Sequence, residues 1–224
     1  MVPAPLVFVD VPLNGSEAPT VTLEIPPHRA VSVVGGENSG VHLMGRLALG
    51  LITPKAGHLT VLGKELATLP RQELLAYRRL VGYLPAGDGL LQNLTLGQNV
   101  ALPLSFGSDF SEGEIESRLD IMLAAAGLAN AGHLRPAQAN DEQRRRAALA
   151  RALAFDPKLV VLEDPFVGLT DRASRSILET ARGGEIEEGS RRTVFVVGPS
   201  LPASVIRRFE IRYRLIHGVL QQEG

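Results

Sequence analysis

Two glycines, Gly35 and Gly40, frame a short polar turn after an apolar segment that we expect to form a strand over residues 30–34. A G-x-x-x-x-G frame between a strand and a helix is typical of a phosphate-binding loop, in which main-chain N–H groups surround an anion. The residues that we take as a weak or vestigial cradle of this kind are Gly35, Gly36, Asn38, Ser39 and Gly40.

The two residues after the frame do not have the chemistry of a working loop. A nucleotide-binding loop continues with Lys, which meets the β- and γ-phosphates, and with Ser or Thr, whose hydroxyl binds Mg²⁺. Here the residues are Val41 and His42. Three interpretations stay open at this point: a chance pair of glycines, an unusual nucleotide site, or a nucleotide site that has lost its chemistry.

Composition excludes several classes of function. The chain has 224 residues, a formal net charge of −1 and no cysteine. This length suits one α/β domain with a substantial core. The charge gives no general attraction to nucleic acid, and the lack of cysteine excludes disulfides, thiolate metal sites and a cysteine nucleophile. There is no apolar run of about 18 residues and the start of the sequence does not resemble a signal peptide, so we expect a soluble cytoplasmic protein.

The elements that must position the loop can be read from apolar periodicity. Strands are expected at 6–11, 20–25, 30–34, 81–84 and within the apolar runs "KLVVLEDP" and "RTVFVVGP". Helices are expected at 41–51, 70–80, 112–128, 141–154 and 171–182. In the second of these helices we expect Leu74, Leu75 and Leu80 to share an apolar face. The segment 182–192 is expected to be an exposed turn.

The segment "DEQRRRAALARALAFDPKLVVLEDPFVGL" resembles the part of ATP-binding-cassette (ABC) ATPases that joins the signature helix to the Walker B strand. The resemblance implies an α/β, P-loop NTPase-like fold with a mainly parallel core sheet and an N-terminal antiparallel β part. It implies one domain over 1–224, with a helical subdomain inserted at about 87–155. The strings "NVALPL", "RRAALARAL" and "DPFVGL" resemble most closely the ATPase subunits of Mce-type (Mla-like) lipid transporters.

The resemblance also identifies the positions at which the family's reactive residues would stand. Val41 replaces the lysine, His42 the Mg²⁺-binding hydroxyl, Ala86 the glutamine near the attacking water, and Pro199 the switch histidine. The acidic pair that ends the Walker B strand is reversed, as Glu163 and Asp164. Charge is kept, but the second carboxylate is one methylene shorter, and general-base geometry tolerates little displacement.

The signature motif is changed as well. The family has L-S-G-G-Q where this chain has "ANDEQ", and Asp141 and Glu142 would repel a triphosphate. The same carboxylates suit the positive end of a helix dipole. Asn140 is the expected N-cap, and Gln143 completes a box-like pattern with it.

Taken together, the changes predict that ATP hydrolysis is lost and that no catalytic residue is retained. Charge-assisted hydrogen bonds contribute about 1.5 to 3 kcal/mol each, so losing three weakens ATP binding by several powers of ten. ATP and Mg²⁺ are implied by the resemblance only, and we expect no cofactor. No metal site is expected either, because His42 shows no ligand spacing with the other histidines.

The leading hypothesis is a pseudo-ATPase: a cytoplasmic scaffold or regulator at the inner membrane that binds a membrane permease, for example in lipid transport. The region Leu90 to Phe106 falls where the family receives a permease, although it could simply be core. A homodimer or an assembly with other transporter subunits is expected, and the arginines of "QRRRAALAR" are expected to make local ion pairs or subunit contacts instead of binding nucleic acid. The alternatives are a divergent but active ABC ATPase and a non-enzymatic anion-binding module.

Overall fold

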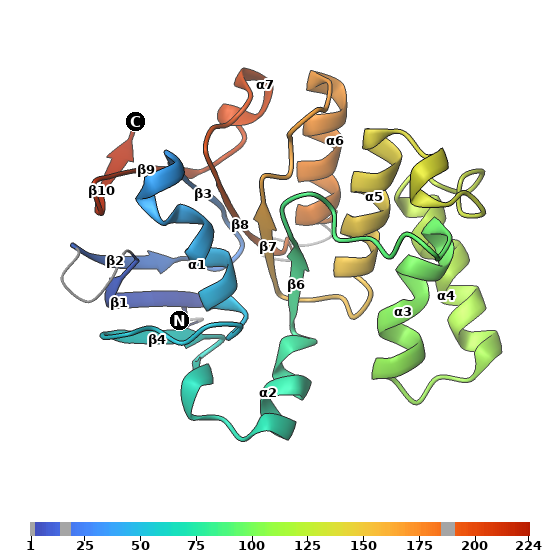
Figure 1. The fold of residues 1–224 in the computed structure, drawn as a ribbon, viewed down its shortest axis with the longest axis horizontal. Coiled ribbons are helices and arrows are strands. Elements are labelled where there is room, and N and C mark those ends of the chain that lie inside the picture. Colours follow the sequence, from blue (N-terminus) through green and yellow to red (C-terminus); the bar gives the residue numbers. More distant parts are fainter. Residues whose placement is uncertain (1–2, 14–18, 185–190) are drawn as a thin grey trace.

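The computed structural model describes residues 3–13, 19–184 and 191–224 and contains two β-sheets within them (Figure 1). The smaller sheet has the order β2-β1-β4-β5 and the larger one β10-β9-β3-β8-β7-β6. The strands of the smaller sheet are β1 (Leu6–Pro12), β2 (Thr20–Ile25), β4 (His58–Val61) and β5 (Lys64–Glu65). Those of the larger sheet are β3 (Ala30–Gly35), β6 (Val81–Leu84), β7 (Leu159–Glu163), β8 (Thr193–Gly198), β9 (Ile211–Ile216) and β10 (Val219–Glu223).

Strand directions agree with the expected architecture. In the larger sheet β6, β7, β8, β3 and β9 run parallel to their neighbours, and only β10 is antiparallel, to β9. All pairings in the smaller sheet are antiparallel. The prediction of a mainly parallel core sheet with an N-terminal antiparallel part is therefore confirmed.

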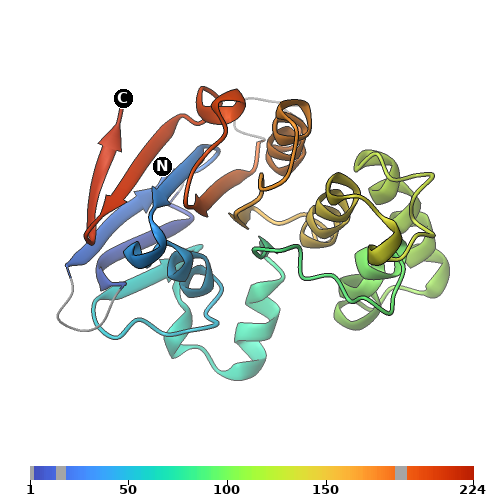
Figure 2. The ribbon, with the colours of Figure 1, turned by 45° about the horizontal axis from the view of Figure 1, so that its top comes forward.

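The helices fall into two groups: α3, α4 and α5, which lie between β6 and β7 in the chain, and the remaining helices. The α-helices are α1 (Val41–Ala48), α2 (Arg71–Arg78), α3 (Leu96–Gly107), α4 (Glu112–Ala125), α5 (Asp141–Ala152), α6 (Asp171–Arg182) and α7 (Ala203–Ile206). Short 3₁₀ turns are η1 (Glu37–Ser39), η2 (Leu66–Thr68) and η3 (Pro136–Gln138). Helices α3, α4 and α5 come between β6 and β7 in the chain, and α3 and α4 stand to one side of the sheets in both views (Figures 1 and 2).

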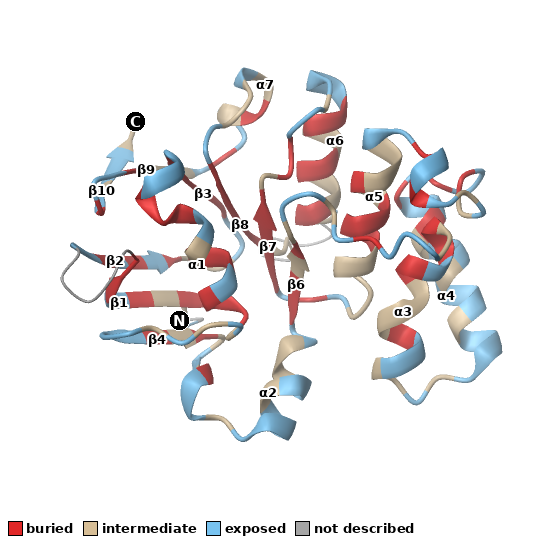
Figure 3. Cartoon of the chain, viewed as in Figure 1, coloured by how far each residue is buried: buried red, intermediate tan, exposed pale blue. Residues whose placement is uncertain are grey.

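The central strands are buried on both faces. All five residues of β7 are buried, and the four apolar ones alternate between two clusters of apolar side chains. Val160 and Leu162 pack in the cluster that contains residues of α5 and α6, whereas Leu159 and Val161 pack with α1 and the smaller sheet. This double burial explains why β7 is an unbroken apolar run, and Figure 3 shows β7 and β8 as buried throughout.

The expected apolar face of the second helix is wrong. Leu75 is 50% exposed and Leu80, beyond the end of α2, is 44% exposed, and only Leu74 of the three packs against the core. No residue of α2 is buried. Polar contacts add to the packing of Leu74, because Arg78 donates from Nε and Nη2 to the carbonyls of Leu49 (3.0 Å) and Gly50 (2.7 Å).

Helix α3 and the hairpin of β9 and β10 are among the elements that lie where no specific helix or strand was expected. Helix α3 contains Pro103, which interrupts the sequence pattern, but the fully buried Asn99 stabilises its first turn. Asn99 accepts the Leu91 N–H at Oδ1 (2.8 Å) and donates from Nδ2 to the carbonyls of Leu91 (3.0 Å) and Thr95 (2.9 Å). The hairpin of β9 and β10 is the second case.

Of the expected turn over 182–192, residues 185–190 lie outside the described residues.

Candidate functional site

The candidate phosphate loop runs from the end of β3 to the start of α1. Gly40 has φ 79°, in the left-handed region that favours glycine, and this conformation turns the chain into α1. A Cβ at Gly35 would lie 2.5 Å from Ser39 Oγ, so the interior of the loop has no room for a side chain there. The backbone thus keeps the turn of a phosphate loop.

Hydrogen bonds within the loop use part of its binding capacity. Ser39 donates from Oγ to the carbonyl of Gly36 (2.6 Å) and accepts the main-chain N–H of Val41 at the same oxygen (3.2 Å). The Ser39 N–H also donates to Gly36 O (2.9 Å). An anion in the loop would therefore compete with Ser39 for the Val41 N–H.

The position after Gly40 faces the protein interior. The Val41 side chain is 4% exposed and packs in the apolar cluster between the sheets, together with Val31 and Met44. His42, in contrast, is exposed. The loop consequently carries a buried apolar side chain at the place where the resemblance implies a lysine.

Glu163 ends β7 and is directed at α1. The residue is 8% exposed, and its Oε1 has no hydrogen-bond partner within the described part of the chain. A Cβ at Gly45 would overlap Oε1 and lie 3.0 Å from the carboxyl carbon. The longer acid at this position is thus accommodated by the missing side chain at Gly45.

Burial governs the electrostatics of Glu163. Burial raises the pKa of its carboxyl, while interactions with the Tyr83 hydroxyl and the Ala86 main-chain N–H oppose that shift. The structure therefore brings the main chain of Ala86 next to Glu163. Burial also raises the pKa of Tyr83, and the neighbouring carboxylate adds to this shift.

Asp164 is accommodated by a second glycine. Its φ is 46°, and its Oδ1 is buried without a hydrogen-bond partner among the described residues. A Cβ at Gly198 would overlap this oxygen. Burial raises the pKa of Asp164, and the neighbouring Arg145 opposes the shift. Asp164 and Pro199 both line a cavity of about 210 Å³.

The start of α5 is capped as the sequence predicts. Asn140 accepts the Gln143 N–H at Oδ1 (2.8 Å), and the Asn140 N–H donates to Gln143 Oε1 (3.0 Å). Asp141 pairs with Arg144, and Glu142 pairs with Arg146 (2.8 Å). The predicted local ion pairs of this helix are confirmed for these two acids.

Sequence reasoning missed a cluster of charges that joins α5 to the segment after β6. Arg144 Nε lies 3.4 Å from Asp88 Oδ2, and Arg151 donates to the carbonyls of Asp88 (3.0 Å) and Gly89 (2.8 Å). Arg145 is 8% exposed; burial lowers its pKa, and the charges of Asp88 and Asp164 oppose that shift. The only sequence signal for this cluster is the "GDG" turn, which places Asp88 between two glycines.

The structure places Glu163 next to α1, but the phosphate loop and the acidic start of α5 belong to helices that pack on different faces of the larger sheet. Helix α1 packs in the cluster on one face of the larger sheet, and α5 packs in the cluster on the other face. Among the described residues no group of three or more His, Asp or Glu is placed to hold a metal ion. The described helices also include none that is long and apolar enough to cross a membrane.

Comparison with known proteins identifies the family. A sequence model of the family described as ABC transporter matches residues 19–167. The chain belongs to the ABC transporter family. Among solved structures, the ATP-binding cassette MJ0796, a dimer in a post-hydrolysis state bound to ADP and Pi, is 26% identical and superposes with a TM-score of 0.85 over 97% of both chains. The ABC ATPase fold expected from the sequence is thereby confirmed.

Curated ABC relatives carry names of importers. Methionine import ATP-binding protein MetN 2 of Pseudomonas entomophila (strain L48) is 29% identical over 199 residues, which cover 88% of this chain and 58% of that protein. MetN of Vibrio cholerae serotype O1 (strain ATCC 39315 / El Tor Inaba N16961) is 32% identical over 177 residues, which cover 79% of this chain and 51% of the relative. The chain thus spans little more than half the length of these relatives.

A further solved structure is similar in fold alone. cbiO1 from Clostridium perfringens, described as part of the ABC transporter complex cbiONQ, has a TM-score of 0.81 and 18% identity over 98% of this chain and 88% of that chain.

Proposed function

We propose that this chain is a degenerate ABC transporter subunit, a pseudo-ATPase that acts as a cytoplasmic scaffold or regulator of a membrane permease. The observation that carries the proposal is the state of Val41. Its side chain is 4% exposed in the core, and its main-chain N–H donates to Ser39 Oγ (3.2 Å). Position 41, where the family has a lysine, therefore supplies no cation to a phosphate. The Val41 main-chain N–H is already hydrogen-bonded to Ser39.

The residues at the loop do not fit a magnesium triphosphate. The Glu163 carboxylate is directed at Gly45, and the Asp164 Oδ1 lies against Gly198. The family's hydroxyl position holds an imidazole, that of His42, which is a poor ligand for Mg²⁺ compared with oxygen. A triphosphate in the loop would meet two carboxyl groups without the cation that offsets their charge, and each lost charge-assisted hydrogen bond weakens binding by about 10- to 150-fold.

The start of α5 supports the same conclusion. In a working signature motif the helix N-terminus remains available for the γ-phosphate of a nucleotide held by a partner subunit. Here Asn140 and Gln143 satisfy two main-chain N–H groups of the helix start. Asp141 and Glu142 place two carboxylates in its first turn. These groups stabilise the helix and disfavour an incoming phosphate.

The region Leu90 to Phe106 is the permease contact that we propose. Its residues divide between the two roles left open by the sequence: Leu96, Val100 and Leu104 are fully buried, whereas Leu91 is 48% and Phe106 84% exposed. We expect the contact to be made by these two exposed apolar side chains. We further propose assembly as a homodimer or with other transporter subunits; the related cassette MJ0796 is a dimer.

The cargo is a separate question. The relatives reported above are named methionine import ATP-binding proteins, and they lend no support to lipid transport or to a Mce-type subfamily. Amino-acid import is therefore the transport setting to be tested first. We retain 1–224 as one domain with a helical subdomain at about 87–155 as part of the proposal.

Calorimetry with ATP and Mg²⁺ tests the loss of chemistry directly. The expected result is no binding in the micromolar range and no phosphate release above background. Micromolar affinity, together with turnover that is lost in Glu163→Gln or Asp164→Asn, would overturn the proposal. The same assays on the complex with its permease, isolated from membranes, include any residue that a partner contributes.

A divergent but active ABC ATPase is the second candidate. It is favoured by one observation, the retention of two carboxylates, Glu163 and Asp164, at the end of β7. Turnover by the assembled complex, but not by the isolated chain, supports this candidate.

A non-enzymatic anion-binding module is the third candidate and uses the loop Gly35 to Gly40. In a panel of anions, a ligand at a hundred times its Kd would stabilise the fold by about 2.7 kcal/mol.

A further inference from the structure

The helices α3, α4 and α5, called here the α3–α5 group, are joined to β6 through a turn of three residues with left-handed backbone. Gly87, Asp88 and Gly89 have φ 77°, 76° and 61°, and they follow the end of β6 at Leu84. Glycine adopts this conformation readily, whereas a residue with a side chain adopts it at a cost. The strained residue at this junction is therefore Asp88, and such strain persists only where surrounding contacts hold it.

Contacts within the turn and from α5 hold Asp88. Its Oδ1 accepts the Leu90 N–H (2.9 Å), and its Oδ2 lies 3.4 Å from Arg144 Nε. Arg151 donates from Nη2 to the Asp88 carbonyl (3.0 Å) and from Nη1 to the Gly89 carbonyl (2.8 Å). Two arginines of α5 thus fix the turn through which the chain enters the α3–α5 group.

The first turn of α5 also lies against the segment that follows β7. Asp141 Oδ2 is 3.2 Å from the position that a Cβ would take at Gly168. Arg144 pairs with Asp141 as well as with Asp88, so one guanidinium joins the first turn of α5 to the turn after β6. Helix α5 therefore contacts the segments that follow two neighbouring strands of the larger sheet, β6 and β7.

Arg145 is a buried cation among these segments. The residue is 8% exposed, and its Nη1 has no hydrogen-bond partner among the described residues. Burial lowers its pKa, and the charges of Asp88, Asp164 and Asp141 oppose that shift. These three acids belong to the turn after β6, to the residue that follows β7 and to the first turn of α5. One positive charge is therefore attracted to three separate places in the chain.

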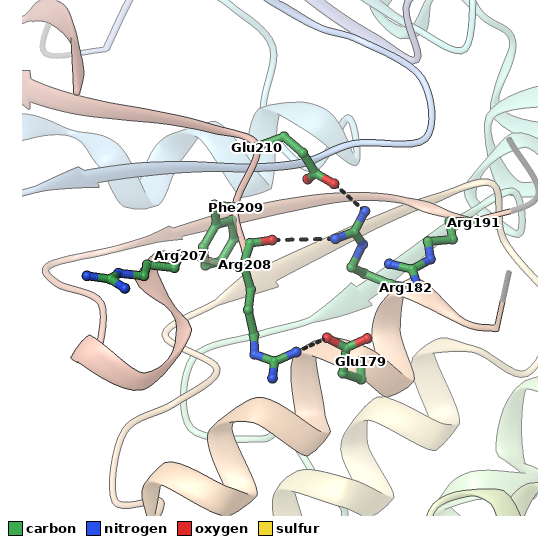
Figure 4. A pocket seen from close by; sticks show the side chains of 7 residues that line it. All are labelled: Glu179, Arg182, Arg191, Arg207, Arg208, Phe209 and Glu210. Atoms are coloured by element: carbon green, nitrogen blue, oxygen red, sulfur yellow. Dashed lines mark hydrogen bonds and ion pairs between the residues drawn. The ribbon is translucent and has the colours of Figure 1, made fainter. Parts of the chain in front are cut away.

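A second buried arginine, Arg182, has a different environment. Arg182 Nη2 donates to Glu210 Oε1 (2.5 Å), and Figure 4 shows this pair together with the pair of Arg208 and Glu179. A direct pair of this kind fixes an arginine to one acid. The charge of Arg145 instead acts between α5 and the ends of two strands, which suits a role in fixing the position of the helix.

We propose that Arg145, together with Arg144 and Asp88, holds the α3–α5 group in one orientation on the larger sheet. Rotation of the group about the turn 87–89 would separate opposite charges that are shielded from solvent, since the Asp88 side chain is 15% and Arg145 8% exposed. The region Leu90 to Phe106 is then presented in one fixed orientation, a consequence that rests on the proposed permease contact. The restraint itself depends neither on that contact nor on ATP.

Distances between two spin labels on the full chain test the proposal. The sequence has no cysteine, so labels attach only where a cysteine is introduced. Glu24→Cys places one label on β2 in the smaller sheet, and Ser117→Cys places the other on α4; both positions are exposed. The measurement needs neither nucleotide nor permease, so its outcome is separate from that of the proposed function.

The variants remove the charges one at a time. Asp88→Asn keeps the size of the side chain, an oxygen acceptor for the Leu90 N–H and the tolerance of left-handed backbone, and it loses the charge. Arg145→Gln removes the buried cation, and Arg145→Lys keeps a positive charge at the same position. The matched control is Asp120→Asn, which removes the charge of an exposed acid of α4.

The expected result is a single narrow distance in the wild type that becomes broader, or gains a second distance, in Asp88→Asn and Arg145→Gln. Amide exchange at Leu90, which reports opening of the turn, should be about tenfold faster or more in Arg145→Gln. Arg145→Lys and Asp120→Asn should keep the wild-type distance and exchange rate.

Three results overturn the proposal: a broad distribution in the wild type, unchanged distances in both Asp88→Asn and Arg145→Gln, or an equal change in Asp120→Asn, which indicates an effect of net charge. Circular dichroism checks that each variant is folded. If the loss of the buried cation unfolds the chain, the result for Asp88→Asn decides.

Discussion

The contact between Gly45 and Glu163 gives the sharpest test of how the exchanged acid is accommodated. Gly45 lies inside α1, where alanine would ordinarily favour the helix by about 1 kcal/mol. In this chain a Cβ at position 45 would overlap Glu163 Oε1 and lie 3.0 Å from the carboxyl carbon. Gly45→Ala therefore has two opposing effects on stability: a gain in helix propensity and a clash with the buried carboxyl group of Glu163.

The size of the effect follows from these two terms. Overpacking a closed site costs about 1 to 3 kcal/mol, so the variant is expected to lose up to about 2 kcal/mol of unfolding free energy after the gain in propensity. With Glu163→Ala in the background the clash is removed, and Gly45→Ala should then stabilise the protein by about 1 kcal/mol. The difference between the two backgrounds, a coupling of about 1 to 3 kcal/mol, measures the contact itself.

Urea unfolding followed by circular dichroism measures all four proteins of this cycle. Gly113→Ala is the control, since this helical glycine has nothing within 4 Å of a Cβ and should gain stability in either background. A Gly45→Ala protein as stable as Gly113→Ala, whatever stands at position 163, would refute the packing of Glu163 against Gly45.

Three further predictions concern the same region. Burial raises the pKa of Glu163 above its ordinary 4.5, so the stability linked to this carboxyl is present below pH 4.5 and is lost as the pH rises through the raised value. The stability advantage of Glu163→Gln over wild type, measured by urea unfolding, should therefore grow with pH. A difference that does not change with pH contradicts this. Asn140→Ala should cost about 1 kcal/mol in thermal unfolding because the cap to the Gln143 N–H is lost, with Asn140→Ser as the mild control; an unchanged midpoint speaks against the cap. The pair Val41→Lys and His42→Ser should lower stability by placing an ammonium in a 4% exposed site and should not restore turnover; phosphate release above background would show that these two losses alone silenced the loop.

Much of the fold was predictable because burial on both faces leaves a clear pattern. The run of β7 reads as an unbroken apolar strand since α1 covers one face and α5 and α6 the other. β2 and α6 were expected over the same residues, 20–25 and 171–182, as the structure has them. The strand β9 was not predicted, although its apolar residues alternate with arginines in the pattern of a half-buried strand.

The site was predictable only in part. Spacing predicted the glycine-framed turn between β3 and α1, and local chemistry predicted the cap made by Asn140, because both depend on neighbours in the chain. The packing of Glu163 against Gly45 joins residues more than a hundred positions apart, so no local pattern reveals it. The same holds for Asp88 with Arg144, where a loop and a helix meet through the tertiary fold.

The strand that carries the phosphate loop has consequences for how the chain matures. β3 is made early, but its two partners in the sheet, β8 and β9, are synthesised only after β4 to β7. Until then both edges of β3 are unpaired, and the smaller sheet lacks the larger sheet against which it packs. Pairings between such distant segments form slowly and leave nascent chains open to aggregation. The core around β3 can thus close only after β8 and β9 have been synthesised.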